Sequence, residues 1–316
     1  MAKINGVLGP IDTADLGFTL MHEHIVVLSP GVEANFPVWD REKELESAVT
    51  KVKDVMARGV KTLVDLTVGN WRDIPFVQEV VRQSGIQLIV ATGVYWEVPH
   101  YFRAESGRSV DHIAELFVRD IQDGIMDTGV KAGVVKCATD EPGVTEDVGR
   151  ILRASARAHR KTGVPISTHT HAASQVGLKQ QDVFEEEGVD LSRVIIGHSG
   201  DSEDIDYLRR LIDRGSYIGM DRFGLDMFLP TDKRVATIAR LCEMGYAEKM
   251  VLSHDANCYI DWADETLLKR VVPRWHFNHI PDDVIPALRD AGVTDEQVRT
   301  MTVGNPRRIF EQQGAY

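Results

Sequence analysis

The chain has 316 residues and carries 48 acidic against 36 basic side chains, so its formal net charge at pH 7 is −12. This charge disfavours binding to nucleic acid or to anionic membrane surfaces, and no apolar run approaches the roughly 18 residues that a membrane helix needs. Three scattered cysteines do not suit a disulfide framework, and the first residues lack a secretory signal. We therefore expect a cytoplasmic protein whose partners are small molecules or a second copy of itself.

Short, β-rich apolar segments recur along the chain, and each is followed by a longer segment with helical periodicity. This alternation predicts repeated βα units and a parallel sheet. The eight expected strands are Phe18–Ile25, Lys61–Val68, Gln87–Val94, Ala132–Cys137, Val164–His169, Arg193–His198, Tyr217–Asp221 and Lys249–His254. The helical patterns between them include Glu44–Arg58, Val110–Gly124, Glu146–Lys161 and Glu203–Arg214.

Helix ends carry local signals of their own. Glycines follow three of the helical patterns, where a left-handed residue commonly ends a helix: Gly59, Gly163 and Gly215. Thr294 and Gln297 have capping-box spacing, and Pro306 opens a terminal helix. No linker divides the chain, so we predict a single domain, residues 1–316, folded as a closed (β/α)₈ TIM barrel. An open doubly wound sheet is the structural alternative.

The first expected strand carries His22 and His24, whose side chains leave the same face of the strand, while Glu23 points the other way. Alone, this pair predicts a metal site no better than it predicts two buried structural histidines. Four other residues at or just past the ends of expected strands strengthen the metal hypothesis, because barrel enzymes carry their catalytic residues there: Lys136, His169, His198 and Asp255.

Lys136 is the most informative of these residues. A lysine at the end of a buried strand is carried into an enclosed site, where burial makes it lose its proton readily. The neutral amine can react with carbon dioxide to form a carbamate, an anionic ligand able to bridge two cations. A lysine whose stem covers the barrel rim is the alternative. The four histidines and Asp255 favour the carbamate.

Several histidines compete for the ligand roles. His169 and His171 alternate on one strand end, and we expect His169 to bind metal and His171 to lie outside the ligand set or in a loop. Asp255 can bind a metal and also accept a proton, whereas its neighbour His254 should face elsewhere. The other histidines lack ligand spacing, and most of them are expected at the surface: His100, His112, His159, His276 and His279.

These motifs resemble the phosphotriesterase family of the amidohydrolase superfamily, and within it the phosphotriesterase-like lactonases. The resemblance extends from Gly9-Pro10-Ile11-Asp12 to Asn305-Pro306-Arg307-Arg308. The motifs that carry it are Thr19-Leu20-Met21-His22-Glu23-His24, Val135-Lys136-Cys137-Ala138, Ser167-Thr168-His169, Ile196-Gly197-His198 and Leu252-Ser253-His254-Asp255.

The resemblance implies a homodimer with two divalent metal ions per chain, zinc first, with cobalt, manganese or iron as alternatives. It implies that the more buried ion is bound by His22, His24 and Asp255. The more exposed ion would be bound by His169 and His198, and carboxylated Lys136 would bridge the two.

Three further residues resemble the substrate contacts of the lactonase branch: Tyr95, Arg222 and Trp262. Without the resemblance, they would be interpreted as a rim tyrosine, a surface ion pair and a loop anchor. The loop 224–232 is short, as in the lactonases, and the long segment 256–279 carries aromatic side chains that suit a lid over an acyl chain.

We therefore expect a hydrolase that opens lactones, N-acyl homoserine lactones first, and hydrolyses phosphotriesters as a promiscuous activity. A metal-bridging hydroxide would attack the carbonyl, Asp255 would shuttle a proton to the leaving alkoxide, and Tyr95 and Arg222 would orient the ring. A dedicated organophosphate or carboxylic ester hydrolase is the runner-up. A metal-stabilised barrel that binds a ligand without turnover is the rival from another class.

Overall fold

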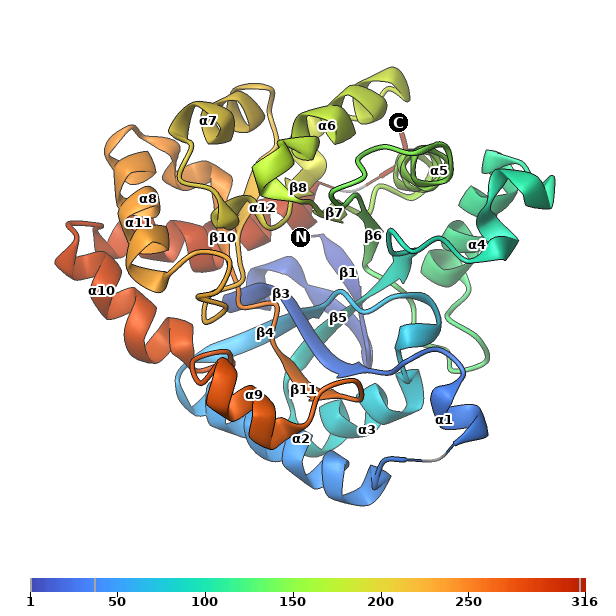
Figure 1. Ribbon diagram of the computed structural model, residues 1–316, viewed down its shortest axis with the longest axis horizontal. Coiled ribbons are helices and arrows are strands. Elements are labelled where there is room, and N and C mark those ends of the chain that lie inside the picture. Colours follow the sequence, from blue (N-terminus) through green and yellow to red (C-terminus); the bar gives the residue numbers. More distant parts are fainter. Residues whose placement is uncertain (1, 37, 313) are drawn as a thin grey trace.

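The computed structural model describes residues 2–36, 38–312 and 314–316. Its main element is a curled parallel sheet with the strand order β10-β9-β8-β7-β6-β5-β4-β3-β11 (Figure 1). The strands are β3 (Phe18–Val27), β4 (Val60–Asp65), β5 (Gln87–Gly93), β6 (Val134–Ala138), β7 (Ile166–His169), β8 (Val194–Ile196), β9 (Tyr217–Met220), β10 (Met250–Leu252) and β11 (Asn257–Ile260). A separate antiparallel hairpin is formed by β1 (Lys3–Gly6) and β2 (Gly9–Asp12).

Helices cover the outside of this sheet (Figure 1). Those that follow the strands are α2 (Arg41–Ala57), α3 (Ile74–Ser84), α4 (Val110–Gln122), α5 (Glu146–Thr162), α6 (Val176–Glu186), α7 (Ile205–Asp213) and α8 (Thr231–Glu243). The shorter helices are α1 (Val32–Asn35), α9 (Glu265–Val271), α10 (Ile285–Asp290), α11 (Asp295–Arg299) and α12 (Asn305–Glu311). Among the residues described, no helix is both long and apolar enough to cross a bilayer.

All eight predicted strands are confirmed, and the fold is the expected (β/α)₈ barrel. The barrel closes between β3 and the end of β10, where the Asp255 N–H donates to the carbonyl of His22 at 3.0 Å. The His22 N–H donates in turn to the Ser253 hydroxyl at 2.8 Å. The sequence did not predict β11, which lies in the expected lid segment and pairs in parallel with β3.

The predicted helix ends are also confirmed. Gly163 ends α5 with a φ of +79°, a left-handed conformation that glycine adopts without steric cost. Thr294 and Gln297 form the capping box that begins α11, and Pro306 lies in the first turn of α12.

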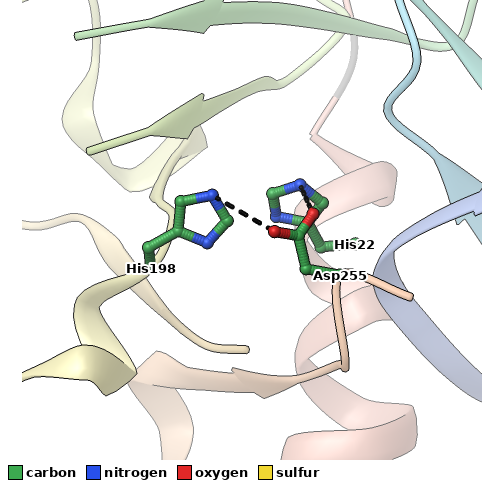
Figure 2. Close-up of side chains that lie close together, drawn as sticks. All are labelled: His22, His198 and Asp255. Carbon is green, nitrogen blue, oxygen red and sulfur yellow. Dashed lines mark ion pairs between the residues drawn. The ribbon is translucent and has the colours of Figure 1, made fainter. Parts of the chain in front are cut away.

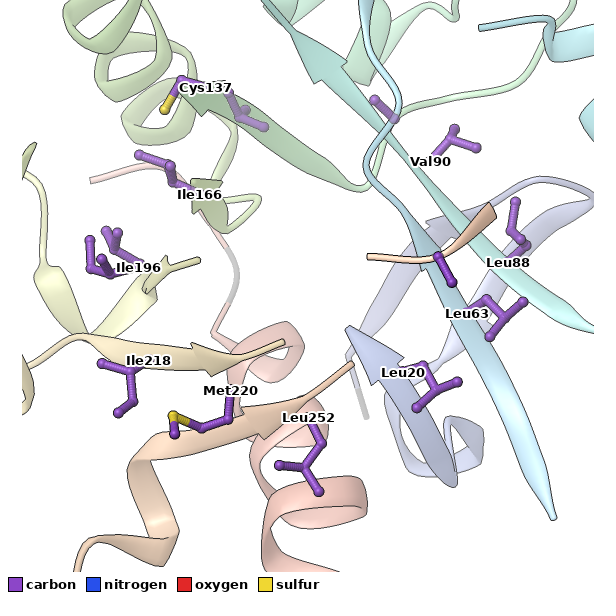
Figure 3. Packing of buried hydrophobic residues seen from close by; sticks show 14 of the residues in the cluster. Leu20, Leu63, Leu88, Val90, Cys137, Ile166, Ile196, Ile218, Met220 and Leu252 are labelled. Carbon is purple, nitrogen blue, oxygen red and sulfur yellow. The ribbon is translucent and has the colours of Figure 1, made fainter. Parts of the chain in front are cut away.

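The core is packed on both sides of the strands. Figure 3 shows part of the larger cluster, with Leu20 on β3, Leu63 on β4 and Ile218 on β9 among its members. A smaller cluster includes Val64 from β4 and Val134 from β6. Since side chains alternate along a strand, Val134 shares a face with Lys136, the next residue but one toward the carboxyl end. The barrel interior thus carries the polar ligand candidates directly above a layer of apolar side chains.

Candidate metal centre

The residues proposed to bind metal and substrate converge at the carboxyl ends of the strands. His22 and His24 extend from β3, Lys136 from β6 and His169 from the end of β7, while His198 and Asp255 follow β8 and β10. One cavity is lined by all nine predicted site residues: His22, His24, Tyr95, Lys136, His169, His198, Arg222, Asp255 and Trp262.

Asp255 lies at the centre of this group. Its Oδ1 atom is 2.9 Å from Nε2 of His24 and 3.2 Å from Nε2 of His22, and its Oδ2 atom is 3.7 Å from Nε2 of His198. Figure 2 shows how the imidazoles of His22 and His198 flank this carboxylate. Ligand atoms of His22, His198 and Asp255 lie within 4.8 Å of one another, close enough to bind a single metal ion.

Asp221 fixes the orientation of two of these histidines. Its carboxylate lies 3.0 Å from Nδ1 of His22 and 2.8 Å from Nδ1 of His198. An imidazole whose Nδ1–H donates to a carboxylate presents the lone pair of Nε2 on the opposite side of the ring. Both Nε2 atoms are therefore directed toward Asp255 and available to a cation.

The other two histidines are held by partners of their own. Nδ1 of His24 lies 2.7 Å from the Thr67 hydroxyl, which leaves Nε2 for the centre. His169 is turned the other way, because its Nε2 lies 2.9 Å from Asp140 and its Nδ1 lies near the hydroxyl of Tyr95, another residue that lines the cavity. His22, His24 and His198 thus each have one nitrogen bound outside the centre and one directed at Asp255, a donor set that suits transition-metal ions.

Lys136 is buried with 2% of its surface exposed, so it is not a lysine of the barrel rim. Its Nζ atom lies 3.0 Å from Nε2 of His22 and 3.4 Å from the carbonyl oxygen of Thr168. Burial lowers the pKa of Lys136 to about 8. The amine is therefore more easily deprotonated than an exposed lysine, as carbamate formation requires.

A chain of largely buried ion pairs leads outward from Asp255. Nε of Arg222 donates to Oδ2 of Asp255 at 3.1 Å, and a second guanidinium nitrogen of Arg222 donates to Asp201 at 3.0 Å. Asp201 also accepts from Arg234, a fully buried residue of α8, at 2.6 Å. Arg222 thus orients the carboxylate of Asp255 as well as lining the cavity.

Backbone strain is concentrated at this site. Three residues that are not glycine adopt left-handed conformations directly after their strands: His198 with φ +57°, Arg222 with φ +64° and Asp255 with φ +57°. Each such residue costs on the order of 1–2 kcal/mol, and strain of this kind persists where the surrounding structure holds it. Its concentration at the strand ends supports a functional role for this site.

The cavity opens above these polar residues between apolar walls. Its volume is about 470 Å³. Much of its apolar lining comes from the loops after β4 and β9, from β11, and from α9 with the segment after it: Leu66, Val68, Trp71, Leu225, Met227, Phe228, Ile260, Leu267, Leu268, Val271, Val272 and Trp275. The Trp262 side chain packs edge-on against Trp71 with 5.6 Å between ring centroids, and Trp262 is 58% exposed. Trp262 therefore stands at the cavity mouth, where the lid was expected.

The remaining histidines lie outside the proposed ligand set, as expected. His171 lies in the loop after β7 with Nδ1 2.9 Å from Ser174, and His254 faces away toward Glu23, both as expected. Most of the other five histidines are exposed, as expected: His100, His112 and His276. His159 and His279 are buried instead. Both are accommodated because each ring nitrogen has a polar partner.

Four polar residues that complete the site were missed as members of it: Thr67, Asp140, Asp201 and Asp221. Asp221 follows β9 directly, so the rule that identified the ligands could have found it. Asp140 lies two residues past β6, within reach of the same rule, whereas Asp201 lies farther into the loop after β8.

Comparison with known proteins decides the family. The sequence matches the phosphotriesterase family over residues 2–310. The chain belongs to this family. A phosphotriesterase homology protein of Mycobacterium tuberculosis is 54% identical over the full length of both chains, and an aryldialkylphosphatase of Saccharolobus solfataricus is 46% identical over 95% of this chain and 96% of its own. The solved structure of the phosphotriesterase from Mycobacterium tuberculosis aligns with this structure over the full length of both chains, with a TM-score of 0.97 at 53% sequence identity.

Membership of the phosphotriesterase family identifies the chain as a hydrolase. The resemblance to the phosphotriesterase family found from the sequence motifs is thereby confirmed.

Proposed function

We propose that the protein is a binuclear metal-dependent hydrolase that opens lactones and hydrolyses phosphotriesters as a lesser activity. N-acyl homoserine lactones are the favoured substrate class. The observation that carries this proposal is the apolar cavity of about 470 Å³ above the cluster of histidines, Lys136 and Asp255. An amphipathic lactone matches this arrangement, since its acyl chain suits the apolar walls and its carbonyl suits the polar floor.

The donor set fits two divalent ions, with zinc as the first candidate. His22, His24 and Asp255 would hold the more buried ion, His169 and His198 the more exposed one, and carboxylated Lys136 would contact both. When bound, such ions lower the pKa of water and polarise a carbonyl oxygen.

The surrounding residues supply proton transfer and orientation. Asp255 would take the proton of the attacking water and pass it to the leaving alkoxide, while Arg222, whose Nε donates to Asp255, would hold the carboxylate in place. The Tyr95 hydroxyl lies 3.2 Å from Nδ1 of His169, at the edge of the cavity floor. Burial, reinforced by Asp255, raises the pKa of Tyr95, so its hydroxyl stays protonated and can donate to the lactone ring.

A dedicated phosphotriesterase is the second candidate, favoured by the 46% identity to an aryldialkylphosphatase. Purified protein should be assayed against lactones of graded acyl-chain length, with paraoxon alongside and Asp255→Asn as the inactive control. We expect kcat/KM for lactones to exceed that for paraoxon and to rise with chain length. A higher kcat/KM for paraoxon would favour the second candidate. No turnover of any substrate by metal-loaded protein would indicate a binding barrel instead.

A further inference from the structure

Two neighbours of the proposed ligands meet each other across the barrel seam. Glu23 lies between His22 and His24 on β3, and His254 directly precedes Asp255; both side chains are fully buried. Oε1 of Glu23 lies 2.6 Å from Nδ1 of His254. The contact joins the first strand to the turn after the last one, two segments that are 231 positions apart in the chain.

The Glu23 carboxylate accepts hydrogen bonds from both sides of Asp255. Oε1 accepts from the Ser253 hydroxyl at 2.9 Å and from the His254 N–H at 3.0 Å, in addition to the His254 ring. Oε2 accepts from the Ala256 N–H at 2.9 Å. A single buried carboxylate therefore binds the residues immediately before and after Asp255.

These hydrogen bonds act on a strained part of the backbone. Asp255 has a φ of +57°, a left-handed conformation that is unfavourable for residues other than glycine and that the surrounding structure must hold. Besides the Glu23 contacts, the N–H of Asp255 itself is fixed by the His22 carbonyl at 3.0 Å. The direction of the Asp255 carboxylate into the cavity therefore depends on what binds its two neighbours.

His254 extends the same connection to the cavity wall. Its Nε2 atom accepts from the Ile280 N–H at 2.9 Å, and its carbonyl accepts from the indole N–H of Trp275 at 3.0 Å. Trp275 lines the cavity above the centre. The segment that follows α9 is thus attached to the same turn that carries Asp255.

We propose that Glu23 and His254 are a pair of positioning residues. Glu23 sets the conformation of the Asp255 turn. The His254 ring couples that turn, through the Ile280 N–H, to the segment that also carries Trp275. This inference rests on the proposed metal-dependent hydrolysis at the same site. It assigns a purpose to the middle residue of the His-x-His motif and to the residue before Asp255.

Substitutions can separate the contacts of Glu23 with the Asp255 turn from the contact of the His254 ring with the Ile280 N–H. Glu23→Gln keeps the shape of the side chain but directs an amide NH₂ at one or more donors. His254→Gln can keep an acceptor near the Ile280 N–H while losing the donor at the Nδ1 position, and His254→Asn does the reverse. Asp120→Asn is the matched control, because it neutralises a largely buried carboxylate bound to Arg72 and Thr92 on another part of the barrel.

The first measurement is the zinc dissociation constant, obtained by competition with a chromogenic chelator, so that it does not depend on turnover. We expect Glu23→Gln and His254→Gln to weaken zinc binding about 10–100-fold, as is typical for loss of a group that orients a ligand. Asp120→Asn should lower Tm while leaving the zinc dissociation constant unchanged. His254→Asn should keep zinc affinity within about threefold and raise KM for long-chain more than for short-chain substrates.

Wild-type zinc affinity and kcat in a folded Glu23→Gln protein would overturn the proposal. The proposal would also be overturned if Asp120→Asn, at the same decrease in Tm, lost as much zinc affinity and kcat as Glu23→Gln. The Glu23 carboxylate would then act on stability alone. Failure of the proposed function is distinguishable, because it would appear in the wild-type protein as absence of zinc binding or of lactone turnover. If wild-type protein hydrolyses only paraoxon, the same comparison of kcat and zinc affinity applies with that substrate.

Discussion

The carboxylate of Asp221 lies 3.0 Å from Nδ1 of His22 and 2.8 Å from Nδ1 of His198. One buried aspartate therefore sets the ring orientation of two proposed ligands. Asp221→Asn should weaken zinc binding about 10–100-fold, because the amide cannot accept two ring N–H donors as strongly as a carboxylate. Chelator competition at fixed pH measures the change.

Asp206→Asn on α7 is the control, since its side chain is 88% exposed and should have no effect on zinc affinity. Equal zinc affinity in Asp221→Asn and wild-type protein would show that Asp221 does not orient the ligands.

Lys136 tests the bridging carbamate. Lys136→Ala should lose most activity and part of its bound metal, and Lys136→Arg should do no better, since a guanidinium keeps its charge and cannot form a carbamate. Propionate added to Lys136→Ala should restore part of the rate by supplying a carboxylate in the vacated space. An unimpaired Lys136→Ala enzyme, together with a bare ammonium in the crystal structure of active, metal-loaded protein, would defeat the carbamate hypothesis.

Trp262 tests the acyl pocket. Trp262→Ala should reduce kcat/KM more for long-chain than for short-chain lactones, by up to about fourfold for each methylene that loses its burial, at about 0.8 kcal/mol each. Trp262→Phe, which retains an aromatic surface against Trp71, should lie between Trp262→Ala and wild type. Equal losses at all chain lengths would remove Trp262 from the acyl pocket.

The buried His159, which does not line the cavity, should make the free energy of unfolding depend on pH. Burial lowers the pKa of His159 to about 4, while its Nδ1 lies 2.6 Å from the Val164 carbonyl oxygen and its Nε2 2.7 Å from the Tyr316 hydroxyl. Above pH 6.5 the imidazole is largely neutral in both the folded and the unfolded protein. Between pH 6.5 and 4 only the unfolded state takes up the proton, so the free energy of unfolding falls by up to about 3 kcal/mol.

His159→Gln should therefore be less stable than wild type at pH 7.5, because it loses these contacts, and the difference should shrink at pH 4.5. Urea unfolding at the two pH values measures it, with the exposed His112→Gln as the control. A difference that stays constant with pH would show that His159 does not bind its proton more weakly in the folded state.

The extent of sequence-based prediction follows from which interactions are local. His22 and His24 could be paired because strand alternation is a local property, and Lys136 could be placed because its strand is apolar up to its end. Asp221 lay within reach of the same rule. The contact of Glu23 with His254 joins opposite ends of the chain, so no local pattern contains it.

The lid illustrates the same limit. Its aromatic composition predicted a wall of the cavity, and Trp262 and Trp275 do line it. The strand β11 inside this segment was missed, because its four residues are defined by pairing with β3, more than 200 positions earlier. Arg234 likewise lies on a helix, and its ion pair with Asp201 depends on how α8 packs.

The central claim is that two divalent ions in this cluster carry hydrolysis. Metal-free protein should be titrated with zinc while lactone turnover and bound zinc are measured in the same samples. Activity should be absent at the start and should reach its plateau at two bound ions per chain. Full activity at one ion per chain, or undiminished activity in metal-free protein, would contradict the account.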